Sequence, residues 1–291
     1  MPRCAFLTLS DTGDYVIDDE LAYDPLEALG WKVTAVPWDR SGNRWDDFDL
    51  VVIRSTWDYH LRVDEFMSVL SDIDRSGARL ENPISLVRWN IDKRYLKDLA
   101  MRGIPTAPTI WRDGLNQGGL SQLMDEIAGD SDVVLKPVLS ANALGAFRLG
   151  RDISQERTNE IESYFAERPF LAQPFIPQIV DEGEYSLCYF NGRYSHTLLK
   201  TPKKNDFRVQ EEHGGIIRGV APEAALLEAA QKVIDLLDVT PLYARADFVR
   251  AGDAESFWLM ELELVEPSLY LRVDPAAPAR FARPLQERMK T

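Results

Sequence analysis

Cysteine, long apolar runs and positive charge are all scarce in this 291-residue chain. Its two cysteines, Cys4 and Cys188, lie far apart in apolar, strand-like segments, which excludes a disulfide framework and a zinc site and predicts buried thiols in a reducing compartment. No apolar run approaches the roughly 18 residues that indicate a membrane span. The N-terminus becomes polar too early for a signal peptide, so we expect a cytoplasmic protein.

Basic residues are outnumbered by acidic ones: 33 lysines and arginines stand against 47 aspartates and glutamates, and the net charge is −14. Nucleic acids and anionic membranes both favour basic surfaces, so neither is expected as a partner. A small anionic ligand remains open where basic side chains converge locally. The hydrophobic fraction of 45% is that of an ordinary globular protein, and the length allows one large lobe or two to three small ones.

The first part of the chain predicts a small α/β lobe. We expect strands at 4–9, 32–36 and 49–54, and helices at 19–29 and 63–73. The nearly all-apolar segment 49–54 is typical of a central, parallel strand. Because ligands meet the carboxyl ends of such strands, the next segment is a candidate substrate site, formed by Arg54, Ser55, Thr56, Trp57, Asp58 and Tyr59. The alternative is an aromatic-rich loop that packs onto the next lobe.

A second α/β unit follows, with expected helices at 92–102, 119–128 and 154–167 and strands at 109–112, 133–137 and 170–176. Lys136 interrupts an apolar strand, where its charge costs desolvation unless an anion meets it. The loop after it consists of small residues, including Ser140 and Gly145, and can lie close over phosphates. Its spacing excludes a P-loop. Lys93 is expected in the first turn of a helix, where anions are favoured.

The third part of the chain contains two predicted hairpins. Asn191-Gly192 joins strands at 184–190 and 193–199, and a polar loop joins strands at 243–249 and 257–264. Period-two alternation places Glu261 and Glu263 on one face of the last strand, and Asp247 with Arg245 on one face of its partner. Three acids in a half-buried sheet repel one another unless cations compensate them, and magnesium is the usual cation. The alternative is that these acids simply face water.

The order of these motifs resembles the ATP-grasp superfamily, with a layout nearest to glutathione synthetase and RimK-like ligases. The matching segments are DK at 92–93, VVLKP at 133–137, the small-residue loop at 139–147, QPFI at 173–176, GEYS at 183–186, the run from Lys200 to Gly215, RADF at 245–248 and E-x-E at 261–263. The resemblance implies an α/β ATP-grasp fold with an N-terminal substrate-side lobe at 1–81, a central subdomain at 82–173 and a C-terminal subdomain with the metal site at 174–291.

The resemblance also implies roles for individual residues. Lys93 and Lys136 correspond to lysines that touch the nucleotide phosphates, and Glu184 corresponds to an acid that holds the ribose. The adenine lies on the segment with Gln173, Phe175 and Ile176, and Ser140 and Gly145 belong to the loop over the phosphates. Asp247, Glu261 and Glu263 match the positions that hold two magnesium ions. The catalytic candidates are Arg208, which matches an arginine on the transferred phosphoryl group, and Lys200 from the same basic run. Arg272 is a third candidate, because a planar guanidinium suits a carboxylate: we expect Arg54 and Arg272 to pair with substrate carboxylates.

The implied activity is that of an ATP- and Mg-dependent ligase, which activates a small carboxylate as an acyl phosphate for attack by an amine. Two features depart from the family pattern. Glu263 replaces the usual asparagine, which leaves the number of ions open, and V-E-P-S at 265–268 replaces the usual S-P-G, so that Glu266, Ser268 and Arg272 are expected to face the acceptor in a way the family does not fix. The spellings RSTWDY and DFRVQ are similar to a branch that includes the cycloserine-forming ligase. Ring closure within one substrate is therefore an alternative, as are a kinase and a nucleotide-binding protein without turnover. A homodimer is an arrangement that the resemblance allows.

Overall fold

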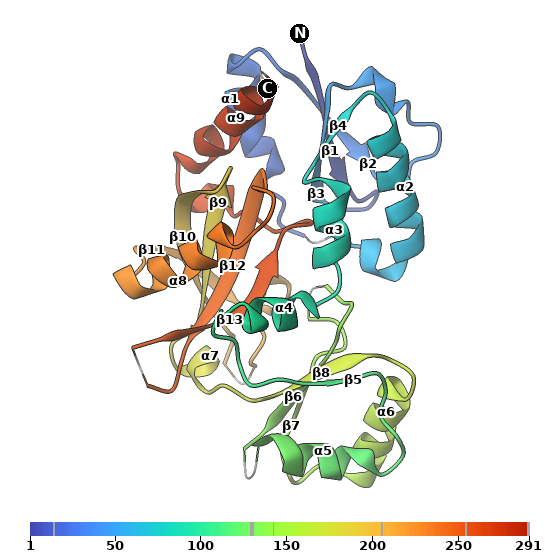
Figure 1. Cartoon of the computed structure of the whole chain (residues 1–291), viewed down its shortest axis with the longest axis vertical. Helices are drawn as coiled ribbons and strands as arrows, with labels where there is room; N and C mark the ends of the chain where they lie inside the picture. The colour runs from blue at the N-terminus through green and yellow to red at the C-terminus, as the bar shows by residue number, and fades with distance from the viewer. Residues whose placement is uncertain (14, 129–130, 142, 205, 254, 290–291) are drawn as a thin grey trace.

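The computed structural model describes residues 1–13, 15–128, 131–141, 143–204, 206–253 and 255–289 (Figure 1). Within these residues the strands form three sheets, which follow one another along the chain and are joined by helices. The α/β fold that the sequence predicts is confirmed. None of the described helices combines the length and the apolar character that a membrane crossing requires.

The N-terminal sheet is parallel, and its order is β2-β1-β3-β4. Its strands are β1 (Arg3–Thr8), β2 (Lys32–Pro37), β3 (Leu50–Ser55) and β4 (Arg79–Glu81), and the helical segments around it are η1 (Asp19–Ala22), α1 (Tyr23–Ala28), η3 (Tyr59–Leu61) and α2 (Val63–Arg75). All six residues of β3 are buried, because the strand lies between β1 and β4 and is covered on both faces. The carboxyl end of β3 points toward the rest of the molecule and delivers Trp57 and Tyr59 to the pocket described below.

The central sheet is antiparallel, and its order is β5-β8-β6-β7. Its strands are β5 (Ile110–Arg112), β6 (Val133–Pro137), β7 (Phe147–Leu149) and β8 (Phe170–Pro174). The helices α5 (Gly119–Ala128) and α6 (Gln155–Phe165) share one apolar core with this sheet, which includes Leu123, Ile161 and Phe165. This lobe lies at the bottom of Figure 1 and leaves the opposite face of β6 and β8 toward the other sheets.

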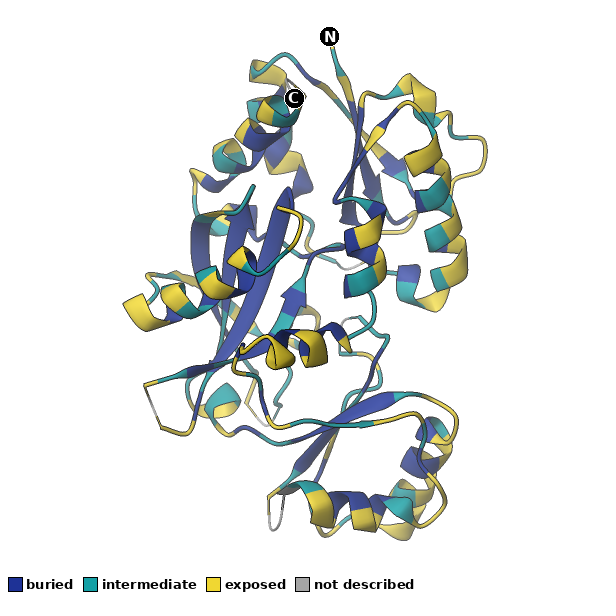
Figure 2. Ribbon diagram, in the orientation of Figure 1, coloured by how far each residue is buried: buried dark blue, intermediate teal, exposed yellow. Residues whose placement is uncertain are grey.

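The C-terminal sheet is antiparallel, with the order β11-β10-β9-β12-β13. Its strands are β9 (Glu184–Phe190), β10 (Arg193–Thr201), β11 (Ile216–Val220), β12 (Tyr243–Arg250) and β13 (Phe257–Glu263). Period two separates its faces: Ala244, Ala246 and Phe248 join the core under α4 (Tyr95–Met101) and α8 (Ala224–Asp235), whereas Arg245 and Asp247 face the pocket. Figure 2 shows β9, β10 and β12 mostly in the colour of buried residues and the outer faces of the helices as exposed.

Hydrophobic contacts cross the predicted lobe boundaries at two places. The helices α3 (Ile84–Asn90) and α4 follow the N-terminal lobe in sequence but supply Leu86, Leu96 and Leu99 to the core of the C-terminal sheet. The last helix, α9 (Ala277–Arg288), packs Phe281 between the N-terminal sheet and the C-terminal sheet, and Figure 1 shows it beside α1. The boundaries at 81 and 173 remain a prediction, while the packing joins all three sheets into one structure.

Candidate active site

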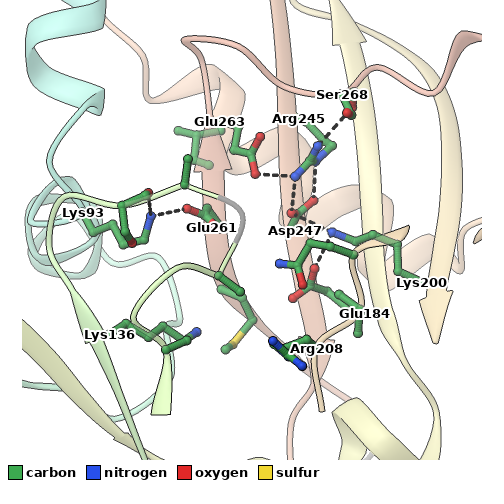
Figure 3. Close-up of a pocket in the computed structure, with 18 of the residues that line it drawn as sticks. Lys93, Lys136, Glu184, Lys200, Arg208, Arg245, Asp247, Glu261, Glu263 and Ser268 are labelled. Carbon is green, nitrogen blue, oxygen red and sulfur yellow. Dashed lines mark hydrogen bonds and ion pairs between the residues drawn. The ribbon is translucent and has the colours of Figure 1, made fainter. Parts of the chain in front are cut away.

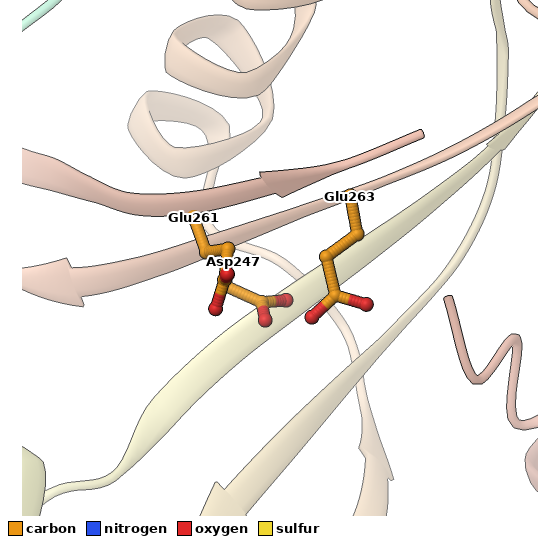
Figure 4. A group of neighbouring side chains, drawn as sticks. All are labelled: Asp247, Glu261 and Glu263. Atoms are coloured by element: carbon orange, nitrogen blue, oxygen red, sulfur yellow. The ribbon is translucent and has the colours of Figure 1, made fainter. Parts of the chain in front are cut away.

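Three acidic side chains meet on the β12–β13 hairpin. The strand register sets Asp247 opposite Glu261 and Arg245 opposite Glu263, so all four side chains lie on the same face. One carboxylate oxygen of each acid lies within 4.8 Å of the others. Figure 4 shows the three side chains side by side. Asp247 is buried, and the side chains of Glu261 and Glu263 are 32% and 27% exposed. The alternative that these acids simply face water is therefore wrong.

A bulge in β13 shapes this part of the pocket. The register of the hairpin shifts between Asp247 and Phe248, so Met260 is an extra residue that has no partner on β12. Such a bulge turns a strand locally and lets two successive side chains approach the same side. Met260 and Glu261 both line the pocket. An apolar wall thus directly adjoins the acidic cluster.

Buried cations hold the acids in place (Figure 3). Arg245 donates to both oxygens of Asp247 at 3.0 Å and also to Glu263, and Ser186 Oγ donates to Asp247 Oδ1 at 2.6 Å. Lys200 Nζ lies 3.0 Å from Asp247 Oδ2 and 2.5 Å from Glu184 Oε1. Burial alone would raise the pKa of Asp247, but Arg245 and Lys200 outweigh it and hold that pKa well below its usual value. Asp247 is therefore ionised at neutral pH.

Two other carboxylates of the pocket, Glu263 and Glu184, are less well compensated than Asp247. Burial, reinforced by Glu261 and Asp247, raises the pKa of Glu263 to about 7 although Arg245 opposes the shift. Burial also raises the pKa of Glu184, and Lys200 offsets this only in part. Three hard oxygen donors in one place, one of them poorly compensated by the protein, are a donor set that suits a divalent cation such as Mg²⁺. The acids present thus fit the metal that the sequence predicts.

Two lysines approach the cluster, Lys93 from the turn between α3 and α4 and Lys136 from the central sheet. Lys93 Nζ lies 2.7 Å from Glu261 Oε1 and donates to the carbonyl of Ser140 at 3.1 Å. Burial would lower its pKa, but Glu261 more than reverses this and keeps Lys93 charged. Lys136 projects into the pocket from β6, and no hydrogen bond or ion pair links it to any of the described residues. Burial lowers the pKa of Lys136, because its charged form has lost water without gaining an ion pair among those residues, so an anion bound beside it would stabilise the charge.

The pocket lies between all three sheets and contains most of the predicted site residues. Those that line it are Trp57, Tyr59, Lys93, Lys136, Ser140, Gln173, Phe175, Ile176, Glu184, Lys200, Arg208, Asp247, Glu261 and Glu263. Arg208 reaches it from the loop after β10, where it pairs with Asp206 at 2.8 Å and its side chain is 37% exposed. Phe207 in the same loop packs edge-to-face against Phe175, which brings the loop to the segment where adenine is expected.

Arg54 is the clearest departure from the predicted site. Its side chain is buried away from the pocket, where Nε donates to Asp19 Oδ1 at 3.0 Å and Nη2 donates to the carbonyl of Pro267 at 3.2 Å. The guanidinium also lies over the rings of Tyr243 and Phe281. The guanidinium of Arg54 therefore pairs with the buried carboxylate of Asp19, whereas we expected it to pair with the carboxylate of a substrate.

Three neighbours of Arg54 also lie outside the pocket lining. Ser55 Oγ shares a hydrogen bond with Thr8 at 2.8 Å, Thr56 is completely buried, and Asp58 accepts from Trp38 Nε1 at 2.7 Å. Ser55 and Asp58 thus bind partners within the N-terminal lobe, and the chain enters η3 immediately after Asp58. Trp57 and Tyr59 are thus the members of this segment that can meet a substrate.

Gly145 and Arg272 are also absent from the pocket lining. Gly145 has a φ of +72°, and a Cβ there would lie 2.2 Å from the hydroxyl of Tyr164, so close packing in a left-handed turn explains the glycine. Arg272 pairs with Asp18 at 2.8 Å and with Glu211, and it joins the N-terminal lobe to the loop that carries Arg208. Both positions shape the surroundings of the pocket.

Arg245 and Tyr270 line the pocket although neither had a predicted role. Arg245 could have been found from the sequence, because it shares a strand face with Asp247. Tyr270 lies in an irregular segment after β13 for which no periodicity applies, as do Glu266 and Ser268, which were expected on the acceptor side and line the pocket. Their exposure to the pocket follows from tertiary contacts.

The comparisons with known proteins agree with this geometry. A family model described as the N-terminal domain of D-cycloserine synthetase DcsG matches residues 4–82. The cycloserine biosynthesis protein DcsG of Streptomyces lavendulae is 31% identical over 278 residues, which are 90% of this chain and 90% of that protein. The chain belongs to the DcsG family of ATP-grasp ligases.

Solved structures extend the likeness to the whole fold. The crystal structure of D-cycloserine synthetase DcsG has a TM-score of 0.84 and 25% identity, with 99% of each chain covered. The RimK domain ATP-grasp protein from Sphaerobacter thermophilus has a TM-score of 0.69 and 18% identity, with 98% of this chain and 99% of that one covered. The predicted superfamily, fold and class of ATP-dependent ligase are confirmed. Ligases of this superfamily use ATP and Mg²⁺.

Proposed function

We propose that this member of the DcsG family binds Mg–ATP in the pocket and uses it to activate a small carboxylate for attack by an amine. The observation that carries the proposal is the convergence of Asp247, Glu261 and Glu263 with Lys93 and Lys136 around one space. Acids arranged for a divalent cation, beside Lys93 and facing Lys136, which has no ion pair among the described residues, match the charge pattern of a magnesium-bound triphosphate.

The nucleotide would lie along the seam between the central and C-terminal sheets. Lys93 and Lys136 would meet the phosphates, and Ser140 lies in the loop beside them. The segment with Gln173, Phe175 and Ile176 would carry adenine, next to the apolar wall that Met260 adds. Glu184 would take the ribose hydroxyls; its Oε1 binds Lys200, and Oε2 has no partner among the described residues.

Asp247, Glu261 and Glu263 would hold the magnesium, and two ions are the expected number. Bound there, the metal would supply positive charge that offsets the phosphate oxygens. Arg208 is placed to stabilise the transferred phosphoryl group, and its loop would exclude water from the product. Lys200 supports this arrangement because it forms ion pairs with both Asp247 and Glu184 and holds the two carboxylates in place. Arg272 would act on the acceptor side indirectly, since it anchors the loop through Glu211.

The reaction follows from this placement. A carboxylate oxygen of the substrate attacks the γ-phosphorus, and ADP leaves. The amine then attacks the acyl carbon of the acyl phosphate, inorganic phosphate leaves, and the amine loses a proton as the amide forms. The protein contributes alignment of two anions that would otherwise repel each other.

Ring closure within a single substrate is a second candidate. It is supported by the 31% identity to the cycloserine biosynthesis protein DcsG, which extends over 90% of both chains. In that case the attacking nitrogen belongs to the same molecule as the activated carboxylate, and no second substrate is needed.

Hydroxylamine gives a direct test, because it traps an acyl phosphate as a hydroxamate whatever the natural amine is. We would incubate the protein with Mg–ATP, hydroxylamine and a panel of small carboxylates and measure ADP and hydroxamate. Equal amounts of both with any acid support the proposal, and Asp247→Asn serves as the blank. Omitting hydroxylamine separates the two candidates: ADP and phosphate that still accumulate with one acid and no amine, together with a product one water lighter than that acid by mass spectrometry, indicate ring closure. ADP with neither hydroxamate nor free phosphate would point to a kinase and refute the proposal.

A further inference from the structure

The segment after β13 is held by an unusual set of contacts. Residues 264–270 form neither helix nor strand, and we call this segment the strap. Its carbonyls from Leu264 to Leu269 each accept a hydrogen bond from a buried side chain. The donors, in order along the strap, are Asn82 Nδ2, Tyr243 Oη, Trp57 Nε1, Arg54 Nη2, Arg245 Nη1 and His196 Nε2, at distances of 2.8, 2.9, 2.9, 3.2, 3.0 and 2.9 Å.

These contacts give the irregular backbone of the strap the hydrogen-bond donors that a neighbouring strand would give to a strand in a sheet. Six consecutive carbonyls without a ladder would otherwise need water, and the donors come from the N-terminal lobe as well as the C-terminal sheet. Tyr270, at the end of the strap, has a φ of +45°, a strained conformation for a residue with a side chain. Strain of this kind persists where the surroundings enforce it. The strap therefore presents Glu266, Ser268 and Tyr270 to the pocket in fixed positions.

Glu266 differs from the other acids inside the pocket. Glu184, Asp247, Glu261 and Glu263 each form an ion pair with a lysine or arginine, whereas no ion pair of Glu266 exists among the described residues. Glu212, which also lines the pocket, is exposed to solvent. Burial, reinforced by Glu263, raises the pKa of Glu266 to about 8, which reflects the missing cation.

The surroundings of Glu266 indicate what would compensate it. Glu266 is not part of the group of three acids that can hold a metal ion. Its side chain interacts with the hydroxyl of Tyr59, and Trp57 binds its carbonyl, so two buried aromatic residues wall this end of the pocket. In such a water-poor site a carboxylate attracts a hydrogen-bonding cation strongly.

We propose that Glu266 determines substrate specificity: its carboxylate, fixed by the strap beside Trp57 and Tyr59, binds a protonated primary amine on the molecule whose carboxylate is activated. The inference rests on the function proposed above and names the substrate class, a small molecule with an ammonium group and a carboxylate. The ammonium at Glu266 would hold the substrate so that its carboxylate points toward the magnesium site.

Matched pairs of substrates test this assignment. The pairs are alanine with propionate, serine with 3-hydroxypropionate, and O-methylserine with 3-methoxypropionate, with both enantiomers of each amino acid, in the hydroxamate assay. A site built to bind an N–H group rejects an analogue without it strongly, so we expect the wild type to prefer the amino acid by about 10²-fold or more in kcat/KM. Glu266→Gln should lower kcat/KM for the amino acid by about 10- to 100-fold and leave its des-amino partner nearly unchanged.

Two further variants separate recognition from structure. Glu266→Asp keeps the charge and should restore part of the preference, whereas Glu228→Gln removes an exposed acid on α8, outside the pocket, and should change nothing. The KM for Mg–ATP should stay the same in all three variants. The proposal is overturned if the wild type turns over both members of a pair equally, or if Glu266→Gln retains the preference. If the wild type forms neither ADP nor hydroxamate with any pair, the proposed function itself is refuted and this inference with it.

Discussion

Replacing Arg54 by methionine tests whether this arginine is structural. Its guanidinium pairs with Asp19, and both side chains are at most 10% exposed. Methionine fills much of the same volume but leaves the Asp19 carboxylate buried without its cation. Breaking a buried ion pair from one side costs about 3–5 kcal/mol. Loss of the bond to the Pro267 carbonyl adds about 1 kcal/mol.

The expected shift in melting temperature follows from chain length. Unfolding entropy is about 2.1 cal/mol/K per residue, or roughly 0.6 kcal/mol/K for a chain of 291 residues. A loss of about 4–6 kcal/mol thus lowers Tm by about 7–10 °C. Differential scanning calorimetry would measure it, with urea unfolding as a second readout of the free energy. Asp19→Asn in the Arg54→Met background should recover part of the loss, because it removes the unpaired charge.

Two outcomes would refute this reasoning about Arg54. One is a Tm within about 2 °C of the wild type, since the loss of one partner of a buried ion pair should lower the free energy of unfolding by more than that shift reflects. The other is a stable variant whose only defect is a raised KM for the acid substrate, which would restore Arg54 as a direct substrate contact.

Three other predictions concern the pocket. Asp247→Asn should reduce ADP formation by about 10²-fold in a coupled assay while circular dichroism stays unchanged, and activity within tenfold of the wild type would argue against a metal ligand. Glu263→Asn, which introduces the residue usual in the superfamily, should raise the Mg²⁺ concentration for half-maximal activity by about tenfold; an unchanged Mg²⁺ titration would exclude Glu263 from the metal site. Because burial lowers the pKa of Lys136, its charge and the affinity for Mg–ATP should be lost as pH rises through that lowered value, before an ordinary lysine titrates. Calorimetry between pH 7 and 10 should show this loss in the wild type and not in Lys136→Arg; identical profiles would contradict it.

The parts of the site that lie on regular strands could be predicted from the sequence. Alternation alone gives the shared face of Glu261 and Glu263, and the observed β12 and β13 lie within one residue of the expected strands. Lys136 could be identified from the sequence, because a charge inside an apolar strand costs desolvation free energy unless an anion compensates it. Each of these inferences depends on a repeat of two residues, which is local and survives folding.

The predictions that were wrong concern residues whose positions depend on contacts between distant segments. Arg54 meets Asp19 and Pro267, which lie 35 and 213 residues away, and no local pattern indicates either. Lys93 was expected in the first turn of a helix, but α4 begins only at Tyr95. The lysine instead lies in the turn between α3 and α4, where its backbone N–H binds the carbonyl of Val138 and brings the small-residue loop to Glu261. A short helix with no capping side chain gave no signal of where it begins.

The strap explains why the segment after β3 matters although most of it does not line the pocket. Arg54 and Trp57 donate to the successive carbonyls of Pro267 and Glu266, so the N-terminal lobe acts on the substrate side through the backbone of a segment more than 200 residues later. A shift of that lobe relative to the C-terminal sheet would move Glu266 away from Asp247 and Glu261. The distance between substrate ammonium and metal is then set by how the two lobes pack. It follows that substitutions in the buried interface around Phe281 should alter the choice of acid more than the affinity for ATP, because the proposed nucleotide contacts lie outside the N-terminal sheet.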